Sequence, residues 1–127
     1  MWRRRFREAG VNLVEMALII PLLLLILAGV IDLGRAYHTY ITLINASREG
    51  ARYAVNHPYD TAGIELAVRR EAQNSQVDLS AATITISNQG SGGPVHVTVQ
   101  VDFYPILGNV LGISSIPIRA STVFRAR

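Results

Sequence analysis

The chain has 127 residues, enough for one domain, and half of them are hydrophobic, which excludes a disordered polar chain. Its net charge of +3 comes entirely from residues 1–10, where four arginines stand against one glutamate, because residues 11–127 hold equal numbers of arginines and acids. A nucleic-acid-binding surface would spread its arginines over the fold, so no nucleic acid partner is expected, and the absence of cysteine excludes disulfides, zinc thiolates and thiol catalysis.

A long apolar segment follows the arginines. Residues 11–31 are long enough to cross the hydrocarbon core of a bilayer, which takes about 20 helical residues. Because cationic residues favour the cytoplasmic end of a span, we expect a cytoplasmic N-terminus and a single pass through the cytoplasmic membrane. The expected parts are a basic leader (1–10), a transmembrane segment (11–32) and an extracytoplasmic domain (33–127). Two alternatives are a buried helix of a soluble protein and a secretory signal cut after Ala28.

Glu15 is the one charged residue between positions 11 and 31. A carboxylate inside a membrane is costly unless it is paired or protonated, so its presence there indicates a function. If a protease cuts after Gly10, the new ammonium group of Val11 lies about 6 Å from Glu15 along a helix axis. In two chains packed with a small axial offset, the ammonium of one would pair with Glu15 of the next and fix their register. The alternative is that Glu15 lies at the membrane surface and reaches water.

The order of these features resembles a known family. An arginine-rich leader, Gly10, the sequence VNLVE and a long apolar helix resemble the prepilins of the type IV pilin superfamily. Residues 10–40, GVNLVEMALIIPLLLLILAGVIDLGRAYHTY, together with ASREGARYAV at 46–55, more specifically resemble the TadE-like proteins of tight-adherence (Tad) pilus systems. Pro21 fits the family pattern, whereas Met16 stands where an aromatic residue is common.

The resemblance implies a function in pilus assembly. A membrane aspartyl prepilin peptidase would cut between Gly10 and Val11, and the mature chain would be a minor pilin or pseudopilin that is itself no enzyme. The implied partners are this prepilin peptidase, other pilin or pseudopilin subunits, inner-membrane pilus assembly proteins and the lipid bilayer. The first alternative is an uncleaved single-pass anchor whose outer domain binds a ligand or partner. The second is a secreted binding domain released after Ala28.

The helical pattern continues beyond the membrane segment and predicts one helix over residues 12–56, ended by His57-Pro58. Pro21 lacks a backbone donor and is expected to kink this helix. Beyond Asp32 the helix is expected to be amphipathic. Its predicted apolar stripe consists of Leu33, Tyr37, Ile41, Ile44, Ala51 and Val55, and its predicted polar face of Arg35, His38, Thr42, Asn45, Glu49 and Arg52.

Three charged residues, Arg48, Glu49 and Arg52, lie on consecutive turns near the end of this helix. Cations suit the C-terminal end of the helix dipole, which favours a structural role. The alternative is a charged patch that contacts a neighbouring subunit.

The remaining residues predict a small mixed domain. Asp60 or Thr61 can cap a short helix with Ile64, Val68 and Ala72 on one face. Alternating patterns predict strands at 83–87, 95–103 and 116–124, the first two joined as a hairpin. In the third strand, the residues expected to face inward are Ile116, Ile118, Ala120 and Phe124. The predicted fold is α+β and pilin-like, with the long helix packed on a three-stranded antiparallel sheet. No cofactor is expected, and the histidines lack metal-ligand spacing.

Overall fold

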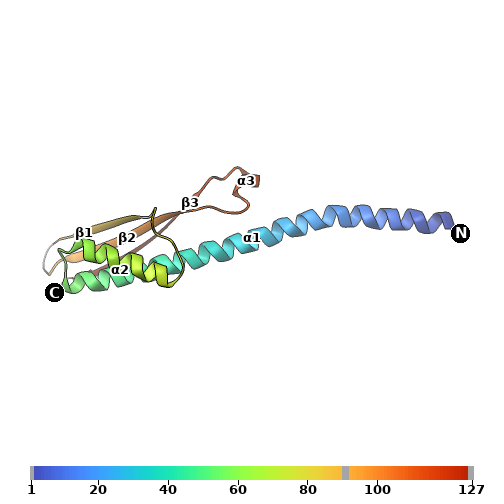
Figure 1. The fold of residues 1–127 in the computed structure, drawn as a ribbon. Helices are drawn as coiled ribbons and strands as arrows, with labels where there is room; N and C mark the ends of the chain where they lie inside the picture. The colour runs from blue at the N-terminus through green and yellow to red at the C-terminus, as the bar shows by residue number, and fades with distance from the viewer. Residues whose placement is uncertain (1, 90–91, 126–127) are drawn as a thin grey trace.

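The computed structural model describes the backbone of residues 2–89 and 92–125, and the side chains of residues 10–89 and 92–125. The predicted α+β fold, a long N-terminal helix with a small three-stranded antiparallel sheet, is confirmed (Figure 1). The elements in chain order are α1 (Trp2–Asn56), α2 (Thr61–Asn74), β1 (Thr83–Asn88), β2 (Pro94–Phe103), α3 (Gly108–Leu111) and β3 (Ile116–Arg125).

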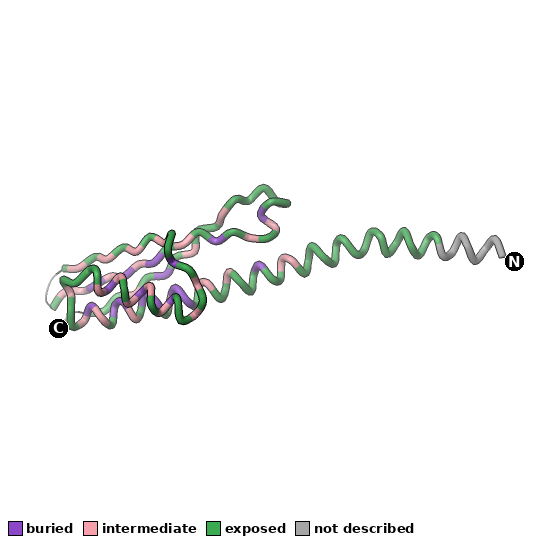
Figure 2. Tube along the Cα trace, viewed as in Figure 1, coloured by how far each residue is buried: buried purple, intermediate pink, exposed green. Residues whose placement is uncertain are grey.

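Helix α1 is continuous from Trp2 to Asn56, so it begins ten residues before the predicted start and runs through Gly10 and Pro21. It ends where expected, because the residue before Pro58 avoids the α region. Its first half stands away from the rest of the chain, whereas its second half packs into the domain (Figures 1 and 2). One helix therefore links an apolar segment, residues 11–31, to a folded domain. We call this segment the apolar rod.

The sheet has the order β1-β2-β3, and both pairings are antiparallel. In the central strand β2, burial alternates with the pleat, so Val95, Val97 and Val99 are fully buried on the face that meets the helices. Helices α1 and α2 cover this face, and the other face of the sheet is left open (Figure 1). The predicted hairpin is confirmed.

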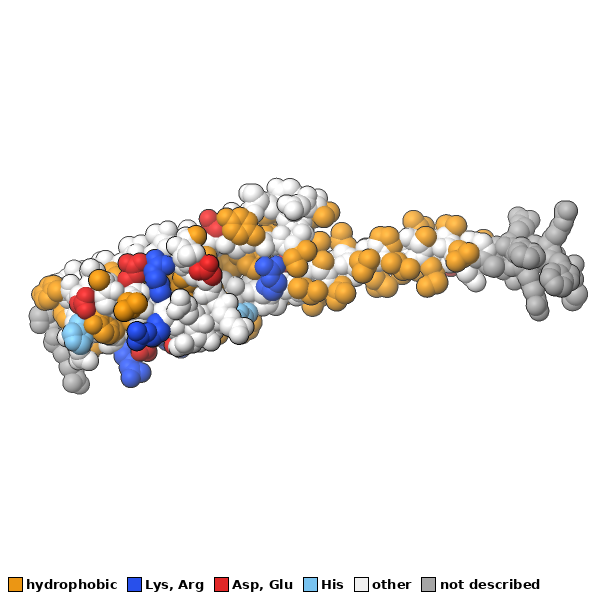
Figure 3. Space-filling view, viewed as in Figure 1, with side chains coloured by type: hydrophobic (Ala, Val, Ile, Leu, Met, Phe, Trp, Pro, Cys, Tyr) orange, Lys and Arg blue, Asp and Glu red, His pale blue; other side chains and the backbone are white. Residues whose placement is uncertain are grey.

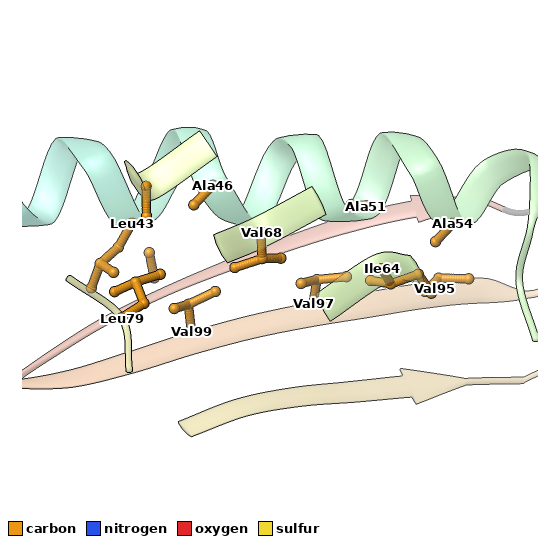
Figure 4. Close-up of a cluster of buried hydrophobic side chains, with 12 residues drawn as sticks. Leu43, Ala46, Ala51, Ala54, Ile64, Val68, Leu79, Val95, Val97 and Val99 are labelled. Atoms are coloured by element: carbon orange, nitrogen blue, oxygen red, sulfur yellow. The ribbon is translucent and has the colours of Figure 1, made fainter. Parts of the chain in front are cut away.

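Helix α2 runs back along the second half of α1 and was predicted correctly. The carboxylate of Asp60 caps its first turn by accepting a hydrogen bond of 2.9 Å from the Gly63 amide. Its buried residues are the expected Ile64, Val68 and Ala72. These three side chains lie against α1 and β2 in the core, whose labelled members are shown in Figure 4.

The core depends on small residues of α1. Gly50 lies where α1 meets α2 and β2: a Cβ atom placed there would overlap the Val68 side chain and come within 3.3 Å of Val97 Cγ1. One helical turn earlier, the fully buried Ser47 donates to the Ile44 carbonyl and shares a 2.7 Å hydrogen bond with Thr122 of β3. The helix thus approaches its neighbours closely at a point where any larger residue would separate them.

The predicted apolar stripe of α1 is wrong in part. Leu33 and Tyr37 are 72% and 65% exposed, and Thr42, predicted to be polar-facing, is buried. The domain surrounds α1 only in its last four turns, with α2 on one side and the sheet on another, so packing there selects small residues over the largest apolar ones. The buried residues of this region are Thr42, Leu43, Ala46, Ser47, Gly50, Ala51 and Ala54. In β3, Ile116 and Phe124 were expected to face inward, but each is 44% exposed, because they lie at the two ends of the strand, where the core covers them least.

Candidate membrane and assembly surface

The free half of α1 is exposed on every face from Val11 to Leu27. Hydrophobic side chains cover it, while charged side chains gather over the domain (Figure 3). In the described residues, this is the one helix long and apolar enough to span a membrane. A helix that is apolar on every face is stable only in apolar surroundings, which a bilayer or other helices would supply.

Gly10, Val11 and Glu15 all lie on this open rod. Each is exposed, and apart from the backbone of α1 itself no described atom lies within 4 Å of the position that a Cβ on Gly10 would take. Among the side chains of residues 10–89 and 92–125, no cation forms an ion pair with the Glu15 carboxylate. The side chains of the leader residues 1–9 lie outside the described residues. Cleavage after Gly10 and pairing of Glu15 between chains stay predictions.

Pro21 lies inside α1 and is exposed. Its ring removes one backbone hydrogen bond from the middle of the apolar half. The helix continues on both sides of it, and the kink stays a prediction.

The apolar half ends at a cluster that sequence reasoning did not find. Asp32 is buried, and its two carboxylate oxygens accept hydrogen bonds from the amides of Ile106 (2.8 Å) and Leu107 (2.9 Å), in the connection between β2 and β3. Arg35 donates to the same carboxylate at 3.1 Å, and its guanidinium lies 5.1 Å from the centre of the Phe103 ring. We call Asp32, Arg35, Phe103 and these two amides the junction cluster. It fixes the β2–β3 connection to α1.

Arg48, Glu49 and Arg52 lie on the outside of the domain half of α1. Arg52 approaches Glu49 at 3.7 Å with 80% of its side chain exposed, an ion pair of little stabilising value. The three residues line a shallow hollow of about 300 Å³, together with Asn45, Glu71 and Phe124. They are accessible to another chain, and their role as a subunit contact stays a prediction.

The turn between α1 and α2 carries a small polar network. The Tyr53 hydroxyl donates to the second carboxylate oxygen of Asp60 at 2.8 Å, and the Tyr53 ring stacks on His57 at 4.7 Å between centroids. The hydrogen bonds from the Gly63 amide and the Tyr53 hydroxyl hold the pKa of Asp60 below its usual value. Asp60 therefore favours the folded state when it is ionised.

We expect the stability conferred by Asp60 to depend on pH. A carboxyl group whose folded pKa is lowered contributes stability above its unfolded pKa, about 3.9, and loses it as pH falls through the folded pKa. Asn at position 60 can still cap α2 but carries no charge. In urea unfolding of the full chain in a non-ionic detergent, Asp60→Asn should be less stable than the wild type at pH 7. This difference should shrink below about pH 4; a constant difference would contradict the role given to the charge.

No three His, Cys, Asp or Glu side chains gather as a metal site in the described part of the chain. A hollow of about 510 Å³ lies beside the junction cluster and is open to solvent. It holds no grouping of nucleophile, base and oxyanion donors.

Comparison with known proteins finds a similarity within helix α1. Residues 10–52 match the family model described as TadE-like protein. Residues 10–52 are therefore similar to TadE-like proteins, and we call them the TadE-like segment. The TadE-like segment begins at Gly10, includes Glu15, Pro21 and the junction residues of α1, and ends two residues after Gly50. No curated protein and no solved structure matches the chain.

The TadE-like segment covers about a third of the chain and lies within α1. The similarity to a membrane protein associated with a Tad pilus therefore rests on this helix. Sequence reasoning placed Gly10 and Glu15 in this segment but passed over Asp32 as the mere end of the apolar run. One signal could have found it: Asp32 is the sole acid of α1 between Glu15 and Glu49. An isolated acid at the end of a span needs partners, and those partners come from residues far away in the sequence.

Proposed function

We propose that this protein is a minor pilin or pseudopilin that takes part in assembly of a Tad-type pilus or a related secretion apparatus. The leader would lie in the cytoplasm, residues 11–32 in the cytoplasmic membrane and residues 33–127 outside it. A prepilin peptidase would remove residues 1–10 by cutting after Gly10. The chain would act as a structural subunit, whose partners are other pilin-like subunits and the inner-membrane assembly proteins.

The observation that carries this proposal is the division of α1 into two halves. The domain buries the second half, whereas residues 11–27 are exposed on all sides and offer one carboxylate, Glu15. Such a helix can leave the lipid and pack against the apolar helices of neighbouring subunits, and the domain does not have to refold. The TadE-like match over residues 10–52 supports the same role.

The proposed assembly step uses the two charges created at the front of the rod. Cleavage exposes the ammonium of Val11 about one helical turn from Glu15. Glu15 has no ion pair among the described side chains, so its carboxylate is available to the ammonium of a neighbouring chain. A pair formed between chains offsets the desolvation of both charges and sets the axial offset between subunits.

A topology experiment tests the membrane part of this proposal. The chain has no cysteine, so a single Tyr59→Cys variant reports on the domain alone, since Tyr59 is 73% exposed. We expect a membrane-impermeant maleimide to label it from outside the cytoplasmic membrane, and the protein to stay in the membrane after alkaline carbonate extraction. A soluble, labelled protein would instead support the secreted domain, and a protected Tyr59→Cys would reverse the orientation.

A further inference from the structure

The connection between β2 and β3, residues 104–115, has an unusual composition for a surface loop. No charged residue occurs from Phe103 to Ile118. Most of its large side chains are apolar and exposed, which is unfavourable in water and typical of a surface that contacts something apolar. The exposed members are Tyr104 (64%), Ile106 (54%), Val110 (69%), Leu111 (60%) and Ile113 (41%).

The structure holds this connection beside the end of the apolar rod. It reaches out from the sheet toward the N-terminal half of α1 (Figure 1). The Asp32 carboxylate binds the amides of Ile106 and Leu107, and Leu107 Cδ1 lies 3.6 Å from the position that a Cβ on Gly29 would take. If residues 11–31 span the bilayer, Gly29 lies only about 3 Å inside the outer end of the span. The connection then lies at the boundary between hydrocarbon and headgroups.

The tip of the connection is compact. The one-turn helix α3 is closed by a 2.9 Å hydrogen bond from the Ile113 amide to the Gly108 carbonyl, and Gly112 adopts a φ of +72° that favours glycine. A Cβ on Gly108 would overlap the Ile113 carbonyl oxygen. Val110, Leu111 and Ile113 are therefore presented from a fixed turn, so little order has to be gained when they enter an apolar phase.

We propose that residues 104–115 form a second membrane contact, in which Val110, Leu111 and Ile113 enter the outer leaflet beside α1 and Tyr104 lies among the headgroups. This inference rests on the proposed membrane span. Tyrosine suits that interface because its ring is apolar and its hydroxyl can form hydrogen bonds with water. The junction cluster makes this contact compatible with Asp32, which would lie at the boundary between hydrocarbon and headgroups. Its carboxylate is already hydrogen-bonded to two amides and to Arg35. Two contacts with the bilayer would fix the tilt and rotation of the domain, which one helix leaves free.

Fluorescence quenching by lipids tests this contact in the full chain. Leu111→Cys would be labelled with an environment-sensitive fluorophore and reconstituted at low protein density in phosphatidylcholine–phosphatidylglycerol vesicles. We expect lipids with a nitroxide near the headgroup to quench this label. Leu23→Cys, in the middle of the rod, should respond to nitroxides deep in the acyl chains. Leu66→Cys, equally exposed on α2 at 57%, should respond to neither and serves as the matched control.

The outcomes distinguish the proposed membrane span from the proposed second membrane contact. Quenching at Leu23 without quenching at Leu111 would overturn the second contact and leave the membrane span intact. No quenching at Leu23 would overturn both. A Leu111 label shielded from lipid nitroxides and from aqueous iodide alike would assign the connection to a contact with another protein, which also overturns the proposal. In the Asp32→Ala background, where the two amides lose their acceptor, the Leu111 label should lose most of its quenching and the Leu23 label should keep it.

Discussion

Replacement of Gly50 by leucine is expected to unfold the domain. Alanine at this position should lower the free energy of unfolding by about 1–3 kcal/mol, the usual effect of overpacking a close contact. The reason is that even a methyl group at position 50 would overlap the Val68 side chain and press on Val97. Urea unfolding of the full chain in detergent, followed by near-ultraviolet circular dichroism, measures the change.

Two further variants make the Gly50 prediction specific. Gly34 lies on the same helix with nothing within 4 Å of its Cβ position, so Gly34→Ala should be neutral or stabilising by up to about 1 kcal/mol. Val68→Ala removes the methyl groups that an alanine at position 50 would meet. The double variant should therefore be more stable than the sum of the single effects predicts, by at least about 0.5 kcal/mol. Strict additivity would show that α1 and α2 do not meet here as described.

Replacement of Glu15 by alanine is expected to leave the protein in the membrane and remove it from the assembly. The alanine variant inserts more easily, because a carboxylate is costly in a bilayer. In the assembly, however, the ammonium of Val11 on a neighbouring chain would be left buried and unpaired. Breaking a buried ion pair in this way costs about 3–5 kcal/mol, which corresponds to at least about a hundredfold lower incorporation.

Crosslinking yields measure this effect. A single Leu22→Cys in the rod allows disulfide crosslinks between neighbouring chains, since the wild type has no cysteine. Asn12→Ala serves as the matched control, because it removes a polar side chain from the same exposed segment without removing a charge. Glu15→Gln should behave like Glu15→Ala, and Glu15→Asp should retain part of the yield. Equal yields from Glu15→Ala and the wild type would show that the charge has no role in pairing.

The fold followed from the sequence wherever one local signal decided the structure. The cap at Asp60, the alternation of Val95, Val97 and Val99, and the break at Pro58 each predicted an element that the structure contains. The buried face of α1 did not follow in the same way, because Leu33 and Tyr37, two large apolar residues of the predicted stripe, are exposed. That face is set by how closely α2 and the sheet approach, which is a tertiary property.

The candidate site divides along the same line. Gly10 and Glu15 could be proposed as candidates from the sequence, because their spacing and their apolar surroundings are local features. The junction cluster could not, since Asp32 binds amides at positions 106 and 107 that only the folded chain brings near. The uncharged stretch from Phe103 to Ile118 was visible as a pattern, but its meaning depends on its position beside Gly29.

We expect the ten-residue leader to be removed, which leaves a membrane-anchored subunit with an ammonium group facing Glu15. The intact mass of the protein, purified from membranes of a host that carries the matching prepilin peptidase, measures this processing. We expect a mature chain of residues 11–127 that begins at Val11. A mass that retains residues 1–10 would contradict the processing step, and a chain that begins at Gly29 would contradict the membrane anchor itself.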